Sequence, residues 1–171
     1  MVAFRRPQNL RNHLVRAKIN TRRNFVPPSC GPCNRPRCQL CSLIPECTYI
    51  VSHTTGQKHR LYCTAGANCS STNVIYCLTC DDCGIQYIGC TNNLRLRLNN
   101  HKSCIRLHKE HRSTDVFRLY QHYRISAGHY FKCTILESRP DTDTLKHFES
   151  RWIYKLRTIF PSGLNILDNV P

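Results

Sequence analysis

The sequence predicts an α+β protein: a small antiparallel sheet flanked by helices, preceded by a cysteine-rich extension. Three observations lead to this fold class. Two short β-type segments, residues 73–79 and 85–89, are separated by a five-residue turn. Further along the chain, apolar residues recur at three- and four-residue steps, which is typical of amphipathic helices. Residues 30–47 are dense in cysteine and proline without any period, so a bound metal must stabilise this segment in place of a hydrophobic core.

Composition divides the 171 residues into three parts. Residues 1–29 are basic and carry a short helix-like apolar pattern that ends at Pro28, so we expect a basic arm or linker. Residues 30–72 are cysteine-rich and are expected to form a metal-binding segment that includes a hairpin. Residues 73–171 have the pattern of a mixed domain and contain the candidate site.

The strands follow from β-branched and aromatic runs bounded by turn residues. Residues 49–51 and 59–62 flank a turn with Gly56, which predicts the hairpin of the second part. In the third part, strands at 73–79 and 85–89 form a second hairpin, with a CxxC motif in its turn.

Two helices are expected next. Thr91 or Asn92 is the predicted N-cap of the first, and Ser113 or Thr114 that of the second. The first helix carries the apolar residues Leu94 and Leu98. The inner side of the second is expected to consist of Val116, Phe117, Leu119 and Tyr120.

A last strand and a long helix complete the domain. Residues 130–136 are the strand candidate, and a helix is expected to follow residues 141–143 and to run to about Thr158. Pro161 and Gly163 are predicted to end it. Its apolar face is Leu145, Phe148, Trp152, Leu156 and Ile159.

The net charge points to a polyanionic partner. Lys and Arg number 25 against 10 acidic residues, a formal charge of +15, and nucleic acid is the commonest polyanion in a cell. No apolar run approaches the roughly 18 residues that span a bilayer, so no membrane association is expected. Because no secretory signal is visible either, we expect an intracellular protein that binds DNA and is retained in the nucleus.

Residues suited to cutting a phosphodiester surround the second hairpin. Tyr76 lies in its first strand, Tyr87 and Gly89 lie in its second, and Arg97 and His101 follow one helical turn apart. Such chemistry needs a base, charge neutralisation at phosphorus, a metal and an acid. A phenol is a poor base at pH 7, but nearby cations are expected to lower its pKa. Each residue alone would be an ordinary packing or surface residue; their order and spacing favour a site.

This order of residues resembles the GIY-YIG family of endonucleases. The resemblance implies that Tyr76 is the base or positions the water, that Arg97 neutralises phosphate, and that Tyr87, Gly89 and His101 complete the active site. The missing side chain at Gly89 is expected to let the backbone approach a phosphate. One departure is Val74, where the family name records a glycine.

Two later residues match the family pattern as well. Glu149, the acidic residue in the second turn of the long helix, resembles the metal-binding glutamate, and Asn165 resembles an asparagine near the end of the domain. A single carboxylate implies one divalent ion with mostly water and phosphate ligands, so Mg²⁺ or Mn²⁺ is the expected catalytic cofactor.

The 13 cysteines are better explained by metal ligation than by disulfides, because they occur in pairs two residues apart in a chain without a visible export signal. Four of them could enclose a structural Zn²⁺: Cys30, Cys33, Cys38 and Cys41. A knuckle that uses three of these sulfurs and a distant fourth ligand is an open alternative. Redox activity, the other function of a CxxC motif, lacks a thioredoxin-like context here.

A second zinc site is expected at the hairpin turn, with Cys69, Cys80 and Cys83 as ligands. Its fourth ligand stays open among Cys63, Cys77, Cys104 and a histidine such as His108. The remaining thiols are expected to be ordinary half-buried side chains: Cys47, Cys90 and Cys133.

The cysteine-rich knuckle, the CxxC turn and the Tyr-Ile-Gly motif together are similar to the C-terminal endonuclease region of Penelope-like retroelements. This resemblance implies a DNA-nicking integration endonuclease, an upstream reverse transcriptase in a parent polyprotein, and possible contact with RNA in a retroelement complex. The main alternative is a catalytically inactive, zinc-containing module that binds nucleic acid. A metal-buffering or redox protein would leave the tyrosine, arginine and glutamate pattern unexplained.

Overall fold

The computed structural model describes residues 27–107, 114–125, 130–139 and 141–166. The arm expected at residues 1–29 therefore lies almost wholly outside the described residues. In the described part of the chain, no helix has the length and apolarity that crossing a membrane requires.

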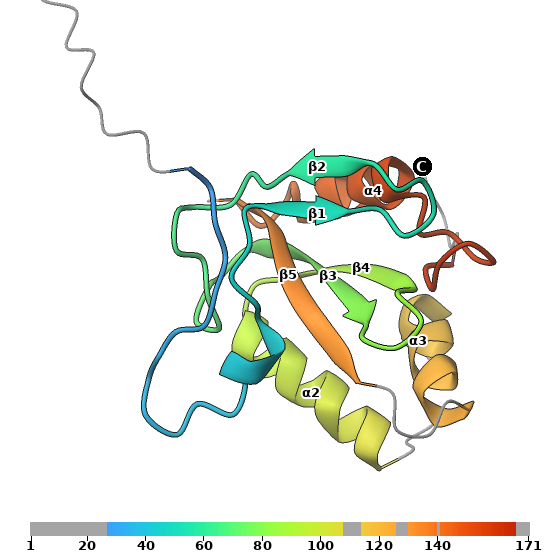
Figure 1. Cartoon of the computed structure of the whole chain (residues 1–171), viewed down its shortest axis with the longest axis horizontal. Helices are drawn as coiled ribbons and strands as arrows, with labels where there is room; N and C mark the ends of the chain where they lie inside the picture. The colour runs from blue at the N-terminus through green and yellow to red at the C-terminus, as the bar shows by residue number, and fades with distance from the viewer. Residues whose placement is uncertain (1–26, 108–113, 126–129, 140, 167–171) are drawn as a thin grey trace, which may run out of the picture.

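A three-stranded antiparallel sheet forms the centre of the fold (Figure 1). Strand β3 (Val74–Cys80) lies between β4 (Gln86–Thr91) and β5 (Phe131–Ser138). All but one of the β3 residues are buried, because helices or loops cover both faces of the central strand. The predicted α+β class with a small antiparallel sheet is confirmed.

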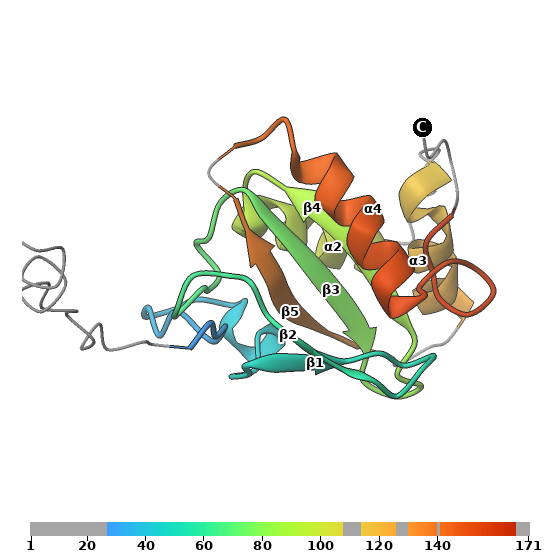
Figure 2. The ribbon, with the colours of Figure 1, turned by 90° about the horizontal axis from the view of Figure 1, so that it is seen from above.

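Helices cover both faces of this sheet. Helix α4 (Leu145–Leu156) lies on one face and α2 (Leu94–Arg106) on the other, with α3 (Thr114–Ile125) beside α2 (Figures 1 and 2). Strand β4 is an edge strand. Side chains from α2 and α4 can therefore approach each other around this edge.

Several expected boundaries shift. Asn93, rather than Thr91 or Asn92, caps α2, because its side chain accepts a hydrogen bond from the Leu96 N–H. Phe117 was expected to face inward but is 47% exposed.

The buried positions of α3 are Val116, Leu119, Tyr120 and Tyr123. They recur at the three- and four-residue steps of a single helix face, and Phe117 lies outside that face. The last helix ends at Leu156, because Arg157 takes a left-handed conformation with φ 53°. Ile159, Pro161 and Gly163 thus follow the helix and do not terminate it.

Helix α4 is held on the sheet by a buried polar contact that sequence reasoning did not identify. The indole Nε1 of Trp152 donates to Glu137 Oε2 on β5 at 2.7 Å, and Arg139 forms an ion pair with the same carboxylate. The Arg139 guanidinium also lies over the ring of Phe148, 3.6 Å from its centroid. These contacts fix how α4 lies along the sheet and therefore where Glu149 is presented.

The cysteine-rich extension packs against the main sheet. It contains the expected hairpin, with β1 (Tyr49–Val51) antiparallel to β2 (Lys58–Arg60) and Gly56 at φ 69° in the turn. It also contains a short 3₁₀ helix, η1 (Cys41–Leu43). Leu40 and Ile44, which flank η1, are each 1% exposed and join the same buried cluster as β3. The expectation that this segment buries no core residues is therefore wrong.

Candidate active site

Tyr76 is the centre of the candidate site. Its side chain is fully buried on the face of β3 covered by α2. Gly89 pairs with it across the hairpin, and a Cβ added at Gly89 would lie 2.6 Å from the phenol oxygen and 2.7 Å from Cζ. The space that a side chain at Gly89 would need is thus occupied by the phenol. The missing side chain makes room for Tyr76, which is a different reason from the expected close approach of a phosphate.

Two side chains hydrogen-bond this phenol directly, and a third connects to it through His101. Arg97 Nε donates to the Tyr76 oxygen at 3.1 Å, and the hydroxyl lies 2.8 Å from His101 Nε2. His101 Nδ1 lies 3.0 Å from the hydroxyl of Tyr120 on α3. Because Arg97 and His101 are four residues apart on α2, one helix face brings both to the same tyrosine. The sequence contained no signal for Tyr120 beyond its apolar face.

The pKa of Tyr76 moves in the direction opposite to the expected one. Burial raises it above the ordinary value of 10.0, and the Arg97 cation offsets only part of that rise. A fully buried phenol loses the hydration that would stabilise its anion, and one cation does not replace it. The phenol is therefore neutral at physiological pH, and its proton needs an acceptor when the oxygen serves as a base.

His101 can be that acceptor. It is completely buried between Tyr76 and Tyr120. Both tautomers fit these distances, and the one with its proton on Nδ1 directs it at Tyr120 and leaves Nε2 to accept from Tyr76. In this arrangement the Tyr76 oxygen accepts from Arg97 and donates to His101.

Glu149 lies at the same site, approaching from α4. Its carboxylate is close enough to Tyr76 to contribute to the raised pKa of the phenol. Cys90 on β4 donates its S–H to Glu149 Oε2 at 3.3 Å. Burial and then the nearby carboxylate raise the pKa of Cys90 to about 12, so the thiol keeps the proton that it donates. Cys90 is half-buried, as expected, and in addition it donates a hydrogen bond to the glutamate.

Tyr87 and Asn165 complete the predicted set. Tyr87 is 2% exposed, and its ring meets that of His101 edge-on at 6.2 Å between centroids.

Asn165 binds the backbone of β4: its Oδ1 accepts from Ile88 N and its Nδ2 donates to Ile88 O, both at 2.8 Å. The same Oδ1 accepts from Thr158 Oγ1 at 2.8 Å. This buried amide fixes the strand between Tyr87 and Gly89, and we assign it a positioning role in place of the predicted catalytic one.

Comparisons with known proteins identify the family of the domain that contains this site. The GIY-YIG catalytic domain family matches residues 72–165, more than half of the chain. The chain belongs to the GIY-YIG nuclease family. Among solved structures, the catalytic domain of the homing endonuclease I-TevI is similar, with a TM-score of 0.48, 23% identity, and coverage of 57% of this chain and 100% of that one. No curated protein matches the sequence.

Outside the matched GIY-YIG domain, a cluster of four sulfurs replaces the first predicted zinc site. The Sγ atoms of Cys33, Cys38, Cys41 and Cys69 all lie within 4.8 Å of one another. This corresponds to the alternative of three knuckle sulfurs and a distant fourth ligand. Backbone N–H groups lower the pKa of Cys33 and lower that of Cys38 to about 6, which favours the thiolates that metals bind, whereas burial raises the pKa of Cys69 to about 12.

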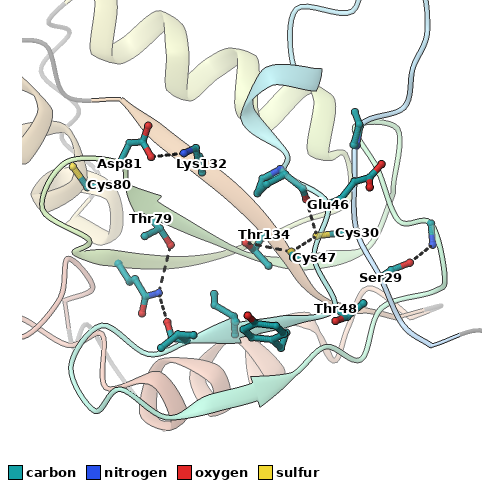
Figure 3. Close-up of a pocket in the computed structure, with 18 residues that line it drawn as sticks. Ser29, Cys30, Glu46, Cys47, Thr48, Thr79, Cys80, Asp81, Lys132 and Thr134 are labelled. Carbon is teal, nitrogen blue, oxygen red and sulfur yellow. Dashed lines mark hydrogen bonds and ion pairs between the residues drawn. The ribbon is translucent and has the colours of Figure 1, made fainter.

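Cys30 was predicted as a ligand but is not part of this cluster. Its sulfur lies 3.1 Å from that of Cys47, and the two residues exchange backbone hydrogen bonds of 3.0 Å in each direction. Figure 3 shows this pair lining a cavity of about 860 Å³ between the hairpin, the cysteine-rich loop and the sheet. Tyr76, Arg97 and Glu149 do not line that cavity, so it is separate from the nuclease site.

A second cluster lies at the turn between β3 and β4. Cys80, Cys83 and His122 of α3 hold their ligand atoms within 4.8 Å of one another. Cys80 and Cys83 were predicted as ligands, whereas Cys69 belongs to the first cluster and His122 was not foreseen. A metal bound here would attach α3, which carries Tyr120, to the hairpin that carries Tyr76.

Proposed function

We propose that this GIY-YIG protein is a divalent-metal-dependent endonuclease that nicks DNA. The observation that carries the proposal is the hydrogen-bonded group of Tyr76, Arg97 and His101 beside the Glu149 carboxylate. These groups provide a route for the proton of an attacking water, a guanidinium for phosphate oxygens, and one carboxylate for a hydrated cation.

The carboxylate fits a catalytic Mg²⁺ or Mn²⁺. Glu149 is half-buried on α4 and accepts a hydrogen bond from the Cys90 thiol through Oε2. Ions of this kind take one or two carboxylates and fill the remaining positions with water and substrate phosphate. When bound, the ion would supply neutralisation of charge on the scissile phosphate.

The proton route follows from the hydrogen bonds. As Tyr76 takes a proton from the attacking water, it passes its own hydroxyl proton to His101 Nε2, so no free phenolate needs to accumulate. Before substrate binds, Arg97 Nε donates to the phenol oxygen. This relay accounts for a base whose own pKa is raised by burial.

Access of water to the phenol requires Arg97 to move. Tyr76 is 0% exposed, and Arg97 already donates to its oxygen. A guanidinium binds phosphate oxygens through paired N–H groups, so an incoming phosphate would draw Arg97 outward. The bound substrate would thereby open the phenol to water.

The biological context belongs to the same proposal. The CxxC turn, the Tyr-Ile-Gly motif and the cysteine-rich extension support a relation to the endonuclease of Penelope-like retroelements. We propose an integration endonuclease of that kind or a descendant of it, acting in the nucleus, with a reverse transcriptase and its RNA as partners. The two cysteine clusters would each hold a structural Zn²⁺.

Nicking of supercoiled plasmid tests the enzyme against the inactive binding module. Glu149→Gln keeps the size and polarity of the side chain and removes its charge. We expect it to lower the nicking rate in Mg²⁺ by at least about 100-fold while DNA affinity stays within about twofold. Asp143→Asn, which removes an exposed carboxylate just before α4, is the matched control and should nick at the wild-type rate. DNA binding without nicking by the wild-type protein, in either Mg²⁺ or Mn²⁺, would establish the inactive module instead.

A further inference from the structure

Arg95 contacts the four-cysteine cluster from the first turn of α2. Its Nη1 donates to Cys38 Sγ at 3.5 Å, and its Nη2 lies 3.8 Å from Cys33 Sγ and 3.1 Å from the hydroxyl of Ser70. Ser70 directly follows Cys69, the fourth sulfur of the cluster. One guanidinium therefore connects three segments of chain that meet at this cluster.

The chemistry of the cluster explains why a cation lies there. Four thiolates around one divalent ion leave a net charge of −2, which favours nearby hydrogen-bond donors. N–H groups that bind ligand atoms from outside fix their orientation and strengthen metal binding. Arg95 provides such donors with a charge that cannot be removed by deprotonation.

Helix α2 presents different faces to the cluster and to the active site. Arg95 and Lys102 are seven residues apart and thus lie on one face. Lys102 Nζ donates to the backbone oxygen of Gln39, between Cys38 and Cys41 of the cluster, at 3.4 Å. Arg97 and His101 lie on another face and reach Tyr76. Because a helix of 13 residues moves as a rigid element, a displacement at one face is transmitted to the other.

Backbone contacts place the start of α2 next to the same cluster. Leu94 N donates to Ser71 O at 3.2 Å, and Asn73 N donates to Asn92 O at 3.4 Å. Residues 70–73 thus follow Cys69, the fourth sulfur of the cluster, and run directly along the N-terminus of α2. Among the described residues of α2, Arg95 is the one whose side chain bonds the sulfurs themselves.

We propose that Arg95 is a positioning residue that couples the Cys33–Cys38–Cys41–Cys69 metal site to the catalytic helix. With the metal bound, the thiolates hold Arg95, and Arg95 holds the first turn of α2 so that Arg97 reaches Tyr76. Loss of the metal or of Arg95 releases that turn and moves Arg97. The activity part of this inference rests on the proposed nuclease function, whereas the metal and geometry parts do not.

Arg95→Ala in the full chain tests the coupling, with Arg106→Ala as the matched control, since Arg106 is an exposed arginine in the last turn of the same helix. The first measurement follows release of Co²⁺ to a chelator through the thiolate-to-cobalt absorption band. We expect Arg95→Ala to release the metal about 10- to 100-fold faster, in line with other contacts to metal ligands. Arg95→Lys retains the positive charge but lacks the paired N–H groups of the guanidinium, so it should recover part of the lost metal retention.

The second measurement reports on the geometry of the site independently of catalysis. The Nε–H resonance of Arg97, which is hydrogen-bonded to Tyr76, should shift in Arg95→Ala and in metal-stripped wild-type protein, but not in Arg106→Ala. In nicking assays, kcat should fall about 10- to 100-fold in Arg95→Ala while KM changes less than about twofold, because positioning and not substrate contact is lost.

Faster metal release together with a shifted Arg97 resonance supports the coupling. Either measurement at the wild-type value in Arg95→Ala overturns it, as does an Arg95→Lys variant that recovers none of the metal retention. A wild-type protein that fails to nick DNA would refute the proposed function, and the first two measurements would still decide the coupling.

Discussion

Replacing Gly89 by alanine tests whether the phenol of Tyr76 needs the position in which the structure holds it. The new Cβ would lie 2.6 Å from the phenol oxygen, 2.7 Å from Cζ and 3.1 Å from Cε1 of Tyr87. Real Cβ contacts are essentially never below 3.0 Å, so the oxygen must retreat by at least 0.4 Å, and by 0.8 Å to reach an ordinary 3.4 Å contact. Tyr76 is fully buried, so little space is available for this shift.

Two effects of measurable size follow. Overpacking of a closed core costs about 1–3 kcal/mol of the free energy of unfolding. A displacement approaching 1 Å also disturbs the 2.8 Å contact to His101 and the 3.1 Å contact to Arg97, and misplacement of this size lowers rates by about 100-fold. Urea unfolding and the kcat of plasmid nicking measure the two effects separately.

Gly31→Ala is the matched control. There the added Cβ would meet the Cγ of the exposed Glu46 side chain at 3.1 Å, and that flexible chain can move aside. Its free energy of unfolding should change by less than about 0.5 kcal/mol. If Gly89→Ala kept both the wild-type stability and the wild-type kcat, the assignment of Gly89 as the space for the phenol would be wrong.

Two further variants test the support of the site. Asn165→Asp loses the donor to Ile88 O and places a carboxylate against that carbonyl, so the free energy of unfolding in urea should fall by about 1–3 kcal/mol. The same change at the exposed Asn92 should have little effect. Equal values for both variants would contradict the role of Asn165 in holding β4. Burial raises the pKa of Cys77 from 9.0 to about 12, so its thiol contributes stability that is fully present below pH 9 and is lost as pH rises toward 12. Between pH 9 and 12, the free energy of unfolding of Cys77→Ala should therefore fall less steeply with pH than that of the wild-type protein. The two slopes should differ by up to about 1.4 kcal/mol per pH unit. Equal slopes would argue against ionisation of Cys77.

The nuclease site could be predicted from the sequence because its signal is local. Tyr76, Gly89, Arg97 and His101 lie within one hairpin and the helix that follows it, where strand pairing and the four-residue helical repeat determine which side chains meet. The amphipathic pattern similarly predicted α4 and placed Glu149 in it. The resemblance to a known family rested on these same short spacings.

Residue spacing did not identify the metal ligands. Cys30 and Cys33 form a CxxC pair, yet Cys33 joins Cys69 while Cys30 faces Cys47. Ligand sets depend on which loops meet in space, and spacing constrains only neighbours along the chain. His122 joined the second cluster for the same reason, since α3 is folded back onto the hairpin turn.

Sequence alone determined the kind of chemistry: the residue types, their order and the strand and helix periods that present them. Tertiary structure alone decided the protonation state of Tyr76 and the contacts that hold the side chains of the site. Burial keeps the Tyr76 phenol neutral despite Arg97, Cys90 donates a hydrogen bond to the Glu149 carboxylate, and Arg95 reaches the four-cysteine cluster. Dielectric environment and long-range contact are properties of the packed chain, and residues distant in sequence create both.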